Sequence, residues 1–203
     1  MFETDAYKLG HGAGGTDGGG MYPAGTEYVY TNFTNRGTRV EGQNHVVSFG
    51  VQAFIQSYIM DAFEPFFAAS EDEVADLYER RVTQILGPND IGSDHIRKLH
   101  RKGFLPLRFN TVKEGSLVPL QVPNLTVENT DPEFFWLTNY IETVLSASIW
   151  FPSTSATTAV RARRVLNKWA DKTGVDRASV DWQYHDFSFR GHTTPESAAA
   201  SGA

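Results

Sequence analysis

The sequence predicts an α/β fold, with an α+β first part that has mixed or antiparallel strands. Hydrophobic residues make up 40% and aromatic residues 13% of the 203 residues, which is typical of a globular protein. Short β-branched and aromatic stretches stand among stretches of helical periodicity. Helices and a strand-like stretch alternate late in the chain, which favours α/β architecture there. We expect one domain over residues 1–126 and a second over 127–203.

Strands are predicted wherever β-branched and aromatic residues gather between turn-forming residues. The stretches 27–33 and 44–49 fit this pattern. Residues 105–127 carry glycine and prolines among short alternating stretches, which indicates several short strands joined by tight turns. A last strand is expected over 180–184.

Helices are predicted from apolar residues at helical spacing. One such stretch covers 50–63. A second begins at a capping box made by Ser70 and Glu73 and ends at Gly87-Pro88, and a shorter one covers 93–102.

The second part contains a further helix start, Thr130-Asp131-Pro132-Glu133, which combines a capping box with a proline in the first turn. The helix that follows is expected to end at Pro152, because proline lacks the backbone N–H that continues a helix. Another helix is expected over 153–173.

Charge and composition exclude several classes of protein. The net charge of −6 argues against a general nucleic-acid binder. The chain has no cysteine, which excludes disulfides, thiolate catalysis and cysteine-ligated zinc. We see no apolar run near the length of a membrane span and no signal-peptide pattern, so we expect a cytoplasmic protein.

The segment Gly12–Gly20 reads GAGGTDGGG, in which six of nine residues are glycine. This composition predicts a flexible loop. Glycine-rich backbone can also wrap a phosphate, but neither a preceding strand nor a following Lys-Ser/Thr pair is present here.

The heptapeptide His185-Asp186-Phe187-Ser188-Phe189-Arg190-Gly191 is the strongest candidate for a binding site. Phe187 offers a ring for stacking, and Arg190 offers a charge-assisted hydrogen bond, so together they suit a flat, polar ligand. The alternative is a core phenylalanine beside a surface arginine.

Other polar groups are less specific. Asp5, Tyr7, Lys8 and His11 cluster near the N-terminus, where a disordered tail is the alternative. Two helices carry basic clusters that we expect to face solvent. The histidines lack metal-site spacing, so no metal ligand is assigned, and no Gly-x-Ser-x-Gly elbow is present. The basic clusters are Arg97, Lys98, Arg101 and Lys102, and Arg161, Arg163, Arg164 and Lys168.

Read together, four stretches resemble the nicotinamide phosphoribosyltransferase family. They occur in the family's order and span nearly the whole chain. The stretches are Thr4–His11 continuing as Met21–Thr26, Ser48–Gln52, Val127–Thr143 and His185–Gly191.

The resemblance implies a reaction in which nicotinamide displaces pyrophosphate from phosphoribosyl pyrophosphate to give nicotinamide mononucleotide for NAD biosynthesis. It implies that the pyridine ring stacks between Phe187 and Tyr7 of a second subunit, next to Asp5. Arg190 would contact nicotinamide or the nucleotide, and Arg36 would lie near the phosphates across the subunit interface. The family's sites therefore require a homodimer, and Mg²⁺ accompanies the pyrophosphate.

Two departures from the family pattern matter. The glycine loop lengthens a spacer that is very short in the family. Family members are also much longer, so the resemblance implies an N-terminal portion in which a β/α barrel begins and stays incomplete, with the remaining catalytic groups expected beyond Ala203. We expect this chain to be inactive alone. The alternatives are a non-catalytic dimerisation or complementing module of a split enzyme and, third, a nicotinate phosphoribosyltransferase.

Overall fold

The structure is a computed structural model that describes residues 2–11 and 21–203. Two compact units make up the chain, and each is built from three separate segments. Unit 1 comprises Met1–Thr34, Gln52–Val112 and Pro123–Ala147, and unit 2 comprises Asn35–Val51, Lys113–Val122 and Ser148–Ala203. These units do not follow the expected division into 1–126 and 127–203, which stays a prediction about domains.

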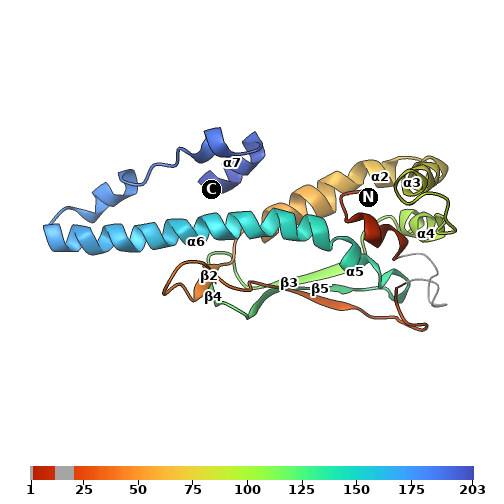
Figure 1. Cartoon of the computed structure of the whole chain (residues 1–203), viewed down its shortest axis with the longest axis horizontal. Helices are drawn as coiled ribbons and strands as arrows, with labels where there is room; N and C mark the ends of the chain where they lie inside the picture. Colours follow the sequence, from red (N-terminus) through yellow and green to blue (C-terminus); the bar gives the residue numbers. More distant parts are fainter. Residues whose placement is uncertain (1, 12–20) are drawn as a thin grey trace. The chain divides into compact units, whose positions relative to one another are not determined.

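Unit 1 contains an antiparallel sheet of three strands in the order β1-β5-β3 (Figure 1). The central strand β5 (Pro123–Asn129) pairs with β1 (Tyr30–Thr34) and with β3 (Leu107–Thr111). Leu125 and Val127 of β5 are buried, as expected for alternate residues on the core face of a sheet.

Strand β1 begins later than the predicted start at residue 27, and the side chain of Asn129 explains why. Its amide nitrogen donates to the carbonyl of Glu27 at 2.9 Å, and its oxygen accepts from the backbone N–H of Val29 at 2.8 Å. The polypeptide before Tyr30 therefore bonds to a side chain and not to a strand backbone.

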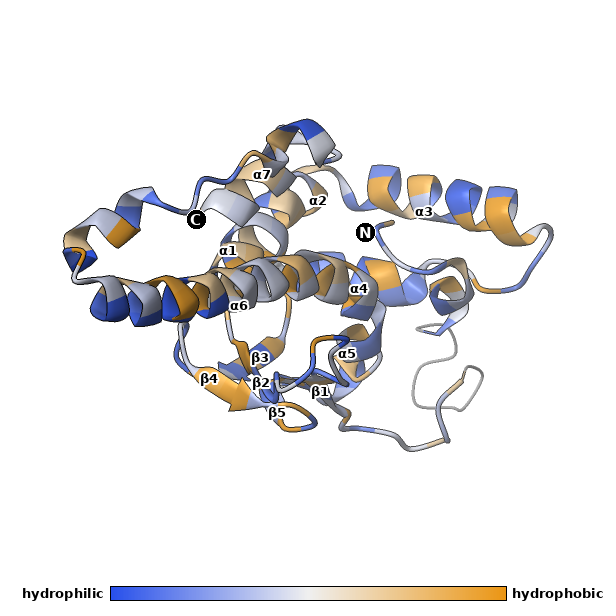
Figure 2. Ribbon diagram, turned by 60° about the vertical axis from the view of Figure 1, so that its left-hand side comes forward, coloured by the Kyte–Doolittle hydropathy of each residue, from blue (hydrophilic) through white to orange (hydrophobic). Residues whose placement is uncertain are grey.

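Two helices of unit 1 confirm their predictions. Helix α3 (Glu71–Leu86) begins at the Ser70–Glu73 capping box, in which both reciprocal hydrogen bonds are present, and it ends at Gly87. Helix α4 (Asp94–Lys102) ends at Gly103, which adopts a left-handed conformation. Apolar and polar faces alternate along α3 in Figure 2, as expected for a helix with one buried stripe.

The predicted helix over 50–63 is a succession of short helical segments. Helix α1 (Val51–Phe54) is followed by the π-helix η3 (Ile55–Met60) and the 3₁₀-helix η4 (Asp61–Phe63). Helix α2 (Glu64–Ala68) comes next, with Pro65 in its first turn, where a missing N–H costs nothing.

The helix start at Thr130 is confirmed in place but differs in form. Asp131 is the N-cap, and its carboxylate accepts from the backbone N–H of Glu133 at 3.0 Å. The helix that begins here is the 3₁₀-helix η5 (Pro132–Phe134), followed by α5 (Leu137–Tyr140).

The core of unit 1 lies around Trp136, which is 1% exposed and packs edge-to-face against His95 and Tyr140. Apolar side chains from the sheet and from α3, α4 and α5 complete this core. They include Tyr78, Val82, Ile96, Leu99, Leu125, Val127, Phe134, Leu137 and Ile141.

Unit 2 contains a two-stranded antiparallel sheet of β2 (His45–Val47) and β4 (Leu117–Pro119). Helix α6 (Glu142–Thr173) begins in unit 1 and continues through Ser148–Thr173 of unit 2. The hydroxyl of Ser153 donates to the carbonyl of Val47, and the N–H of Val47 donates to Thr157 Oγ1 at 2.9 Å.

The expectation that Pro152 ends a helix is wrong, because α6 continues through it. Proline leaves the carbonyl four residues earlier, that of Ser148, without its helical partner. The backbone of Gly50 lies against this point with φ +101°, and a Cβ on Gly50 would come within 3.0 Å of Pro152 Cβ. Glycine therefore suits position 50, because it has no side chain to collide with Pro152.

The expected strand over 180–184 is also wrong. Residues Arg177–Trp182 form the 3₁₀-helix η6, whose N-cap Asp176 accepts from the N–H of Ala178 at 3.0 Å. The 3₁₀-helix η7 (Ser188–Gly191) and helix α7 (Pro195–Gly202) follow.

The described strands pair antiparallel in both sheets. The structure therefore confirms a fold of mixed helix and sheet with antiparallel strands, and it does not show the expected start of a β/α barrel. Across residues 2–11 and 21–203, no helix combines the length and the apolar composition that crossing a membrane requires.

Candidate functional site

The N-terminal polar residues of unit 1 are held by a cluster around a buried lysine, whose carboxylate partners Asp5 and Glu142 are 47% and 60% exposed. Lys8 lies in the 3₁₀-helix η1 (Ala6–Gly10), and its side chain is 3% exposed. Its ammonium group donates to Glu142 Oε2 at 3.0 Å and to Thr143 Oγ1 at 3.3 Å, and it lies 3.6 Å from Asp5 Oδ2. The hydroxyl of Thr143 in turn donates to Asp5 Oδ2 at 2.7 Å. These contacts exclude the disordered-tail alternative for this segment.

Tyr7 lies between Asp5 and Lys8, and its side chain is 65% exposed although Lys8 Nζ lies 5.7 Å from the centre of its ring. The ring of His11 lies 5.6 Å from the Tyr7 ring. Burial and the nearby positive charge of Lys8 both lower the pKa of His11. The exposed tyrosine thus stands beside a neutral imidazole at neutral pH.

A second set of hydrogen bonds holds the other end of η1. The buried hydroxyl of Tyr78 donates to the carbonyl of Leu9 at 2.6 Å. Since this donation uses the only hydroxyl proton, the 3.1 Å contact between Tyr78 and His95 Nε2 requires the imidazole to be the donor. Burial lowers the pKa of His95 to about 4, so the ring is neutral at physiological pH.

The heptapeptide of unit 2 is organised by short-range contacts. Asp186 Oδ1 accepts from the N–H of Ser188 at 2.8 Å, and Oδ2 accepts from the hydroxyl of Ser201 at 2.9 Å. Hydrogen bonding by the side chain of Ser188 lowers the pKa of Asp186 most, followed by the Ser188 N–H and by Ser201. Ser188 Oγ also lies 2.7 Å from His192 Nε2.

Phe187 and Arg190 are both on the surface of unit 2. Phe187 is 73% exposed, which excludes the alternative of a core phenylalanine. Arg190 and Arg36 are exposed, and within the described part of the chain their guanidinium groups form neither an ion pair nor a hydrogen bond. An exposed ring and two unpaired cations are available for a ligand.

The structure brings the five predicted site residues together only in part. Asp5 and Tyr7 are neighbours on unit 1, and Phe187 and Arg190 are neighbours in the heptapeptide of unit 2. Arg36 also belongs to unit 2, on a separate segment. Their roles in binding stay predictions.

Sequence reasoning missed the partners of Lys8. Glu142 and Thr143 lie 134 and 135 residues from Lys8 in the chain, so no local pattern connects them. Lys8, Glu142 and Thr143 all lie within the stretches that resemble the family. This is the signal in the sequence that could have indicated the cluster.

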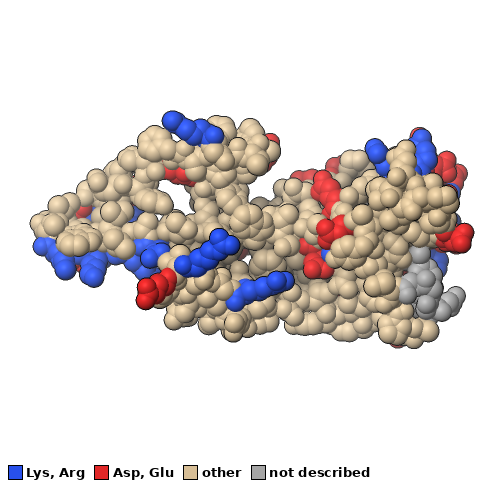
Figure 3. Space-filling model, in the orientation of Figure 1, with Lys and Arg blue, Asp and Glu red and all other residues tan. Residues whose placement is uncertain are grey.

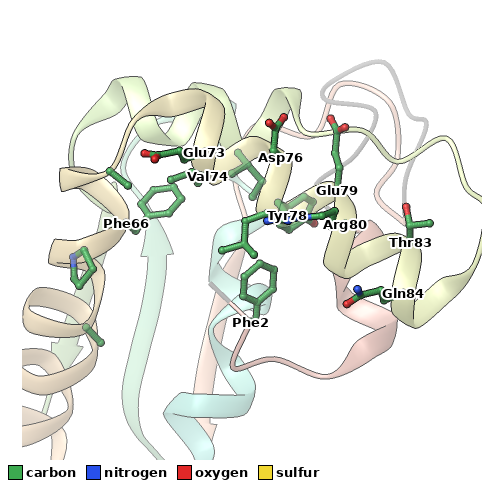
Figure 4. Close-up of a pocket in the computed structure, with 15 residues that line it drawn as sticks. Phe2, Phe66, Glu73, Val74, Asp76, Tyr78, Glu79, Arg80, Thr83 and Gln84 are labelled. Carbon is green, nitrogen blue, oxygen red and sulfur yellow. The ribbon is translucent and has the colours of Figure 1, made fainter.

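A groove of about 1230 Å³ opens on unit 1 beside α2 and α3 (Figure 4). Phe2, Phe66 and Tyr78 contribute apolar surface to the groove. Glu73 and Asp76 of α3 contribute carboxylates. None of the predicted site residues lines this groove.

The two basic helix faces differ from each other. In unit 1, α4 forms ion pairs: Arg101 makes a two-pronged contact with Glu71 at 2.6 and 2.8 Å, and Lys102 lies 2.8 Å from Asp131. In unit 2, basic side chains gather along the C-terminal half of α6 (Figure 3), where Arg163 pairs with Asp181. The basic side chains of α4 are therefore paired with carboxylates, while Lys98 and Arg101 stay 49% and 64% exposed, in agreement with the expected solvent-facing surface.

The described residues contain no group of three or more histidines and carboxylates that could hold a metal ion. The glycine-rich segment Gly12–Gly20, predicted as a flexible loop or phosphate cradle, lies outside the described residues.

Comparisons with known proteins agree with the resemblance stated above. No family model matches the chain. The chain is 45% identical to the nicotinamide phosphoribosyltransferase of Acinetobacter baylyi, over 98% of this chain and 39% of that protein. It is 31% identical to the Mycoplasma pneumoniae protein of the same name, over 98% of this chain and 45% of that one.

A solved structure supports the fold alone. The crystal structure of human nicotinic acid phosphoribosyltransferase matches 70% of this chain with a TM-score of 0.51 and 19% identity, over 25% of that chain. The chain thus spans less than half the length of the curated relatives it matches. Over that span, the resemblance to nicotinamide phosphoribosyltransferases is confirmed by relatives that carry this name.

Proposed function

We propose that this chain supplies the pyridine-binding part of a nicotinamide phosphoribosyltransferase. The observation that carries the proposal is the 45% identity to the Acinetobacter baylyi protein over 98% of the chain. The reaction joins nicotinamide to phosphoribosyl pyrophosphate and releases pyrophosphate, giving nicotinamide mononucleotide for NAD biosynthesis.

The reaction makes two demands on the protein. The ring nitrogen of nicotinamide forms a bond to C1 of the ribose while the bond from C1 to the pyrophosphate oxygen breaks. Positive charge builds on the ribose and negative charge on the leaving group. Catalysis therefore requires orientation of the ring nitrogen and groups that stabilise the charge of the leaving pyrophosphate.

Phe187 and Tyr7 meet the first demand in this proposal by stacking on the two faces of the pyridine ring. Their 73% and 65% exposure supports the assignment, because both rings are available to a ligand. Such stacking contributes about 0.5–1.5 kcal/mol for each ring pair beyond the buried area. Arg190, unpaired in the same turn as Phe187, holds nicotinamide or the nucleotide product.

Arg36 meets part of the second demand by contacting the phosphates. In the proposed homodimer, Tyr7 and Arg36 act in the site of the other subunit, and Asp5 lies beside the stacking tyrosine. Mg²⁺ enters with the pyrophosphate, whose oxygens are ligands that this ion prefers. We assign no residue of this chain as a metal ligand, because the described residues offer no metal-binding cluster.

A second function of a different class is a non-catalytic module that completes another polypeptide. The chain spans 39–45% of the length of the curated relatives that it matches. In this case the chain lends Tyr7 and Arg36 to a partner that holds the remaining catalytic groups. A nicotinate phosphoribosyltransferase is the third candidate, and it differs only in taking the acid in place of the amide.

One experiment separates these functions. The 203-residue polypeptide is assayed for nicotinamide mononucleotide formation alone and mixed with the part of the Acinetobacter baylyi relative that it does not match. We expect product only from the mixture, with each part alone as the control. Product from the 203 residues alone would overturn their proposed inactivity. A mixture that forms a complex but converts only nicotinate would support the third candidate, and a complex without turnover or nicotinamide binding would contradict the proposal.

A further inference from the structure

We propose that Lys8 is a positioning residue that fixes the orientation of Tyr7. This inference rests on the proposed function, in which Tyr7 stacks on the pyridine ring. The structure places Lys8 in a cluster that nothing in the sequence pattern assigns, and all of its contacts with Asp5, Glu142 and Thr143 lie within unit 1.

The first step concerns the geometry of η1. In a 3₁₀-helix, side chains three residues apart lie on the same face. Asp5, the residue before η1, and Lys8 are three apart, and they share the face that contacts Glu142 and Thr143. Tyr7 is offset from that face by one residue, so its ring is 65% exposed while one side of it contacts Lys8 Nζ, 5.7 Å from the ring centre.

The second step concerns the charge of Lys8. An ammonium group that is almost fully buried is stable only when its hydrogen bonds and its charge are matched. Two carboxylates and one hydroxyl surround Lys8 Nζ within 3.6 Å. Removing the lysine therefore leaves Asp5 and Glu142 close to each other without a cation between them.

The third step concerns what is fixed. Thr143 Oγ1 also accepts from the backbone N–H of Asp5 at 3.2 Å, so the cluster holds the backbone before Tyr7 as well as the side chains. The bond from Tyr78 to the carbonyl of Leu9 holds the backbone after it. The backbone is thus held by hydrogen bonds on both sides of Tyr7, and Lys8 belongs to the cluster on the N-terminal side.

The test uses the full chain labelled with 3-fluorotyrosine, with Tyr7→Phe to assign the resonance of Tyr7. In Lys8→Met we expect the Tyr7 fluorine signal to lose at least half of its offset from the position in unfolded protein. Lys8→Arg, which keeps the charge, should restore most of it. Lys102→Met is the matched control, because it also removes a lysine paired with an aspartate of unit 1 and should leave the Tyr7 signal unchanged.

Nicotinamide binding provides the second readout. Where the wild-type protein binds nicotinamide, Lys8→Met should weaken binding about tenfold and Lys102→Met should not change it. A Tyr7 signal that stays in place in folded Lys8→Met would overturn the inference. If the wild type mixed with the unmatched part of the Acinetobacter baylyi relative fails to bind nicotinamide, the proposed function fails, whereas the fluorine signal still decides the role of Lys8.

Thr143→Val is a second variant, which tests the proposal if Lys8→Met does not fold. It keeps the lysine and the shape of residue 143 but removes the hydroxyl that joins Lys8 to Asp5. A displaced Tyr7 signal in Thr143→Val that is restored in Thr143→Ser would support the inference. An unchanged signal in Thr143→Val would overturn it.

Discussion

The N-terminal segment around Tyr7 and the heptapeptide around Phe187 both belong to the stretches that resemble the same family, yet they are held in different ways. Lys8 joins residues more than 130 positions away through a buried ammonium group. The heptapeptide depends on contacts between Asp186, Ser188, His192 and Ser201, which lie at most 15 residues apart. The first segment is fixed by the fold of unit 1, and the second by contacts among residues 186–201.

A binding motif and the contacts that hold it in place are therefore separate properties of a chain. Short-range bonds on exposed groups open at low free-energy cost, whereas buried long-range clusters open with the unit that contains them. Substitutions in the buried network of unit 1 should therefore have larger effects than substitutions of the exposed aromatic residues of unit 2.

The largest effect is expected from Trp136→Ala. Trp136 is 1% exposed at the centre of unit 1, so its loss should reduce the free energy of unfolding by about 3–5 kcal/mol. Trp182→Ala is the control, because Trp182 of unit 2 is 75% exposed and should change stability by less than about 0.5 kcal/mol. Denaturant unfolding monitored by circular dichroism measures both, and similar losses in the two variants would break the contrast.

The next effect is a pH dependence that arises from His95. Burial lowers its pKa from 6.5 to about 4; the nearby charge of Asp94 opposes this shift with a smaller effect, and that of Lys98 adds to it. Because the unfolded state binds the proton more tightly, this contribution to stability is complete above pH 6.5 and is lost as the pH falls towards 4. The expected loss is about 3 kcal/mol.

The variant His95→Gln should flatten this pH dependence, since glutamine can still donate to Tyr78 but does not titrate. The measurement is the midpoint of urea unfolding at several pH values between 7.5 and 4, taken as the difference between wild type and variant. A difference that is constant over this range would show that His95 does not contribute in this way.

The smallest effect concerns binding alone. Phe187→Ala should weaken nicotinamide binding about 2- to 13-fold, the factor that corresponds to one stacked ring. Phe189→Ala is the matched control, since Phe189 lies in the same turn and is 64% exposed. Isothermal titration calorimetry on the mixture described above measures both. Equal losses would contradict the specific role of Phe187.

The sequence predicted those elements whose signals are local. Ser70 and Glu73 are three residues apart and form their capping box without help from the rest of the chain. The short strands over 105–127 were found for a similar reason, because glycine and proline mark the turns between them. The barrel start implied by the resemblance has no counterpart in the strand pairing of the described residues.

The errors arose where distant residues decide the local structure. The helix α6 continues through Pro152, and Gly50, about a hundred residues earlier, packs against this proline where a side chain would not fit. The stretch over 180–184 has the composition of a strand, but Asp176 caps a 3₁₀-helix there and only Val180 of η6 is buried. For the candidate site, the residue types were predicted, whereas the cluster that holds Tyr7 depends on folding and was not.

The π-helix η3 also has a consequence for insertions and deletions. The N–H of Asp61 bonds to the carbonyl of Gln56, five residues earlier, so this turn contains more residues than an α-helical turn. In an α-helix, removing one residue rotates everything that follows by about 100°. A wide turn that tightens to an α-helical one can absorb the loss of a residue, so the helical faces on either side keep their partners. Within residues 50–68, a single-codon deletion between Ile55 and Met60 is therefore the one that this protein should tolerate best.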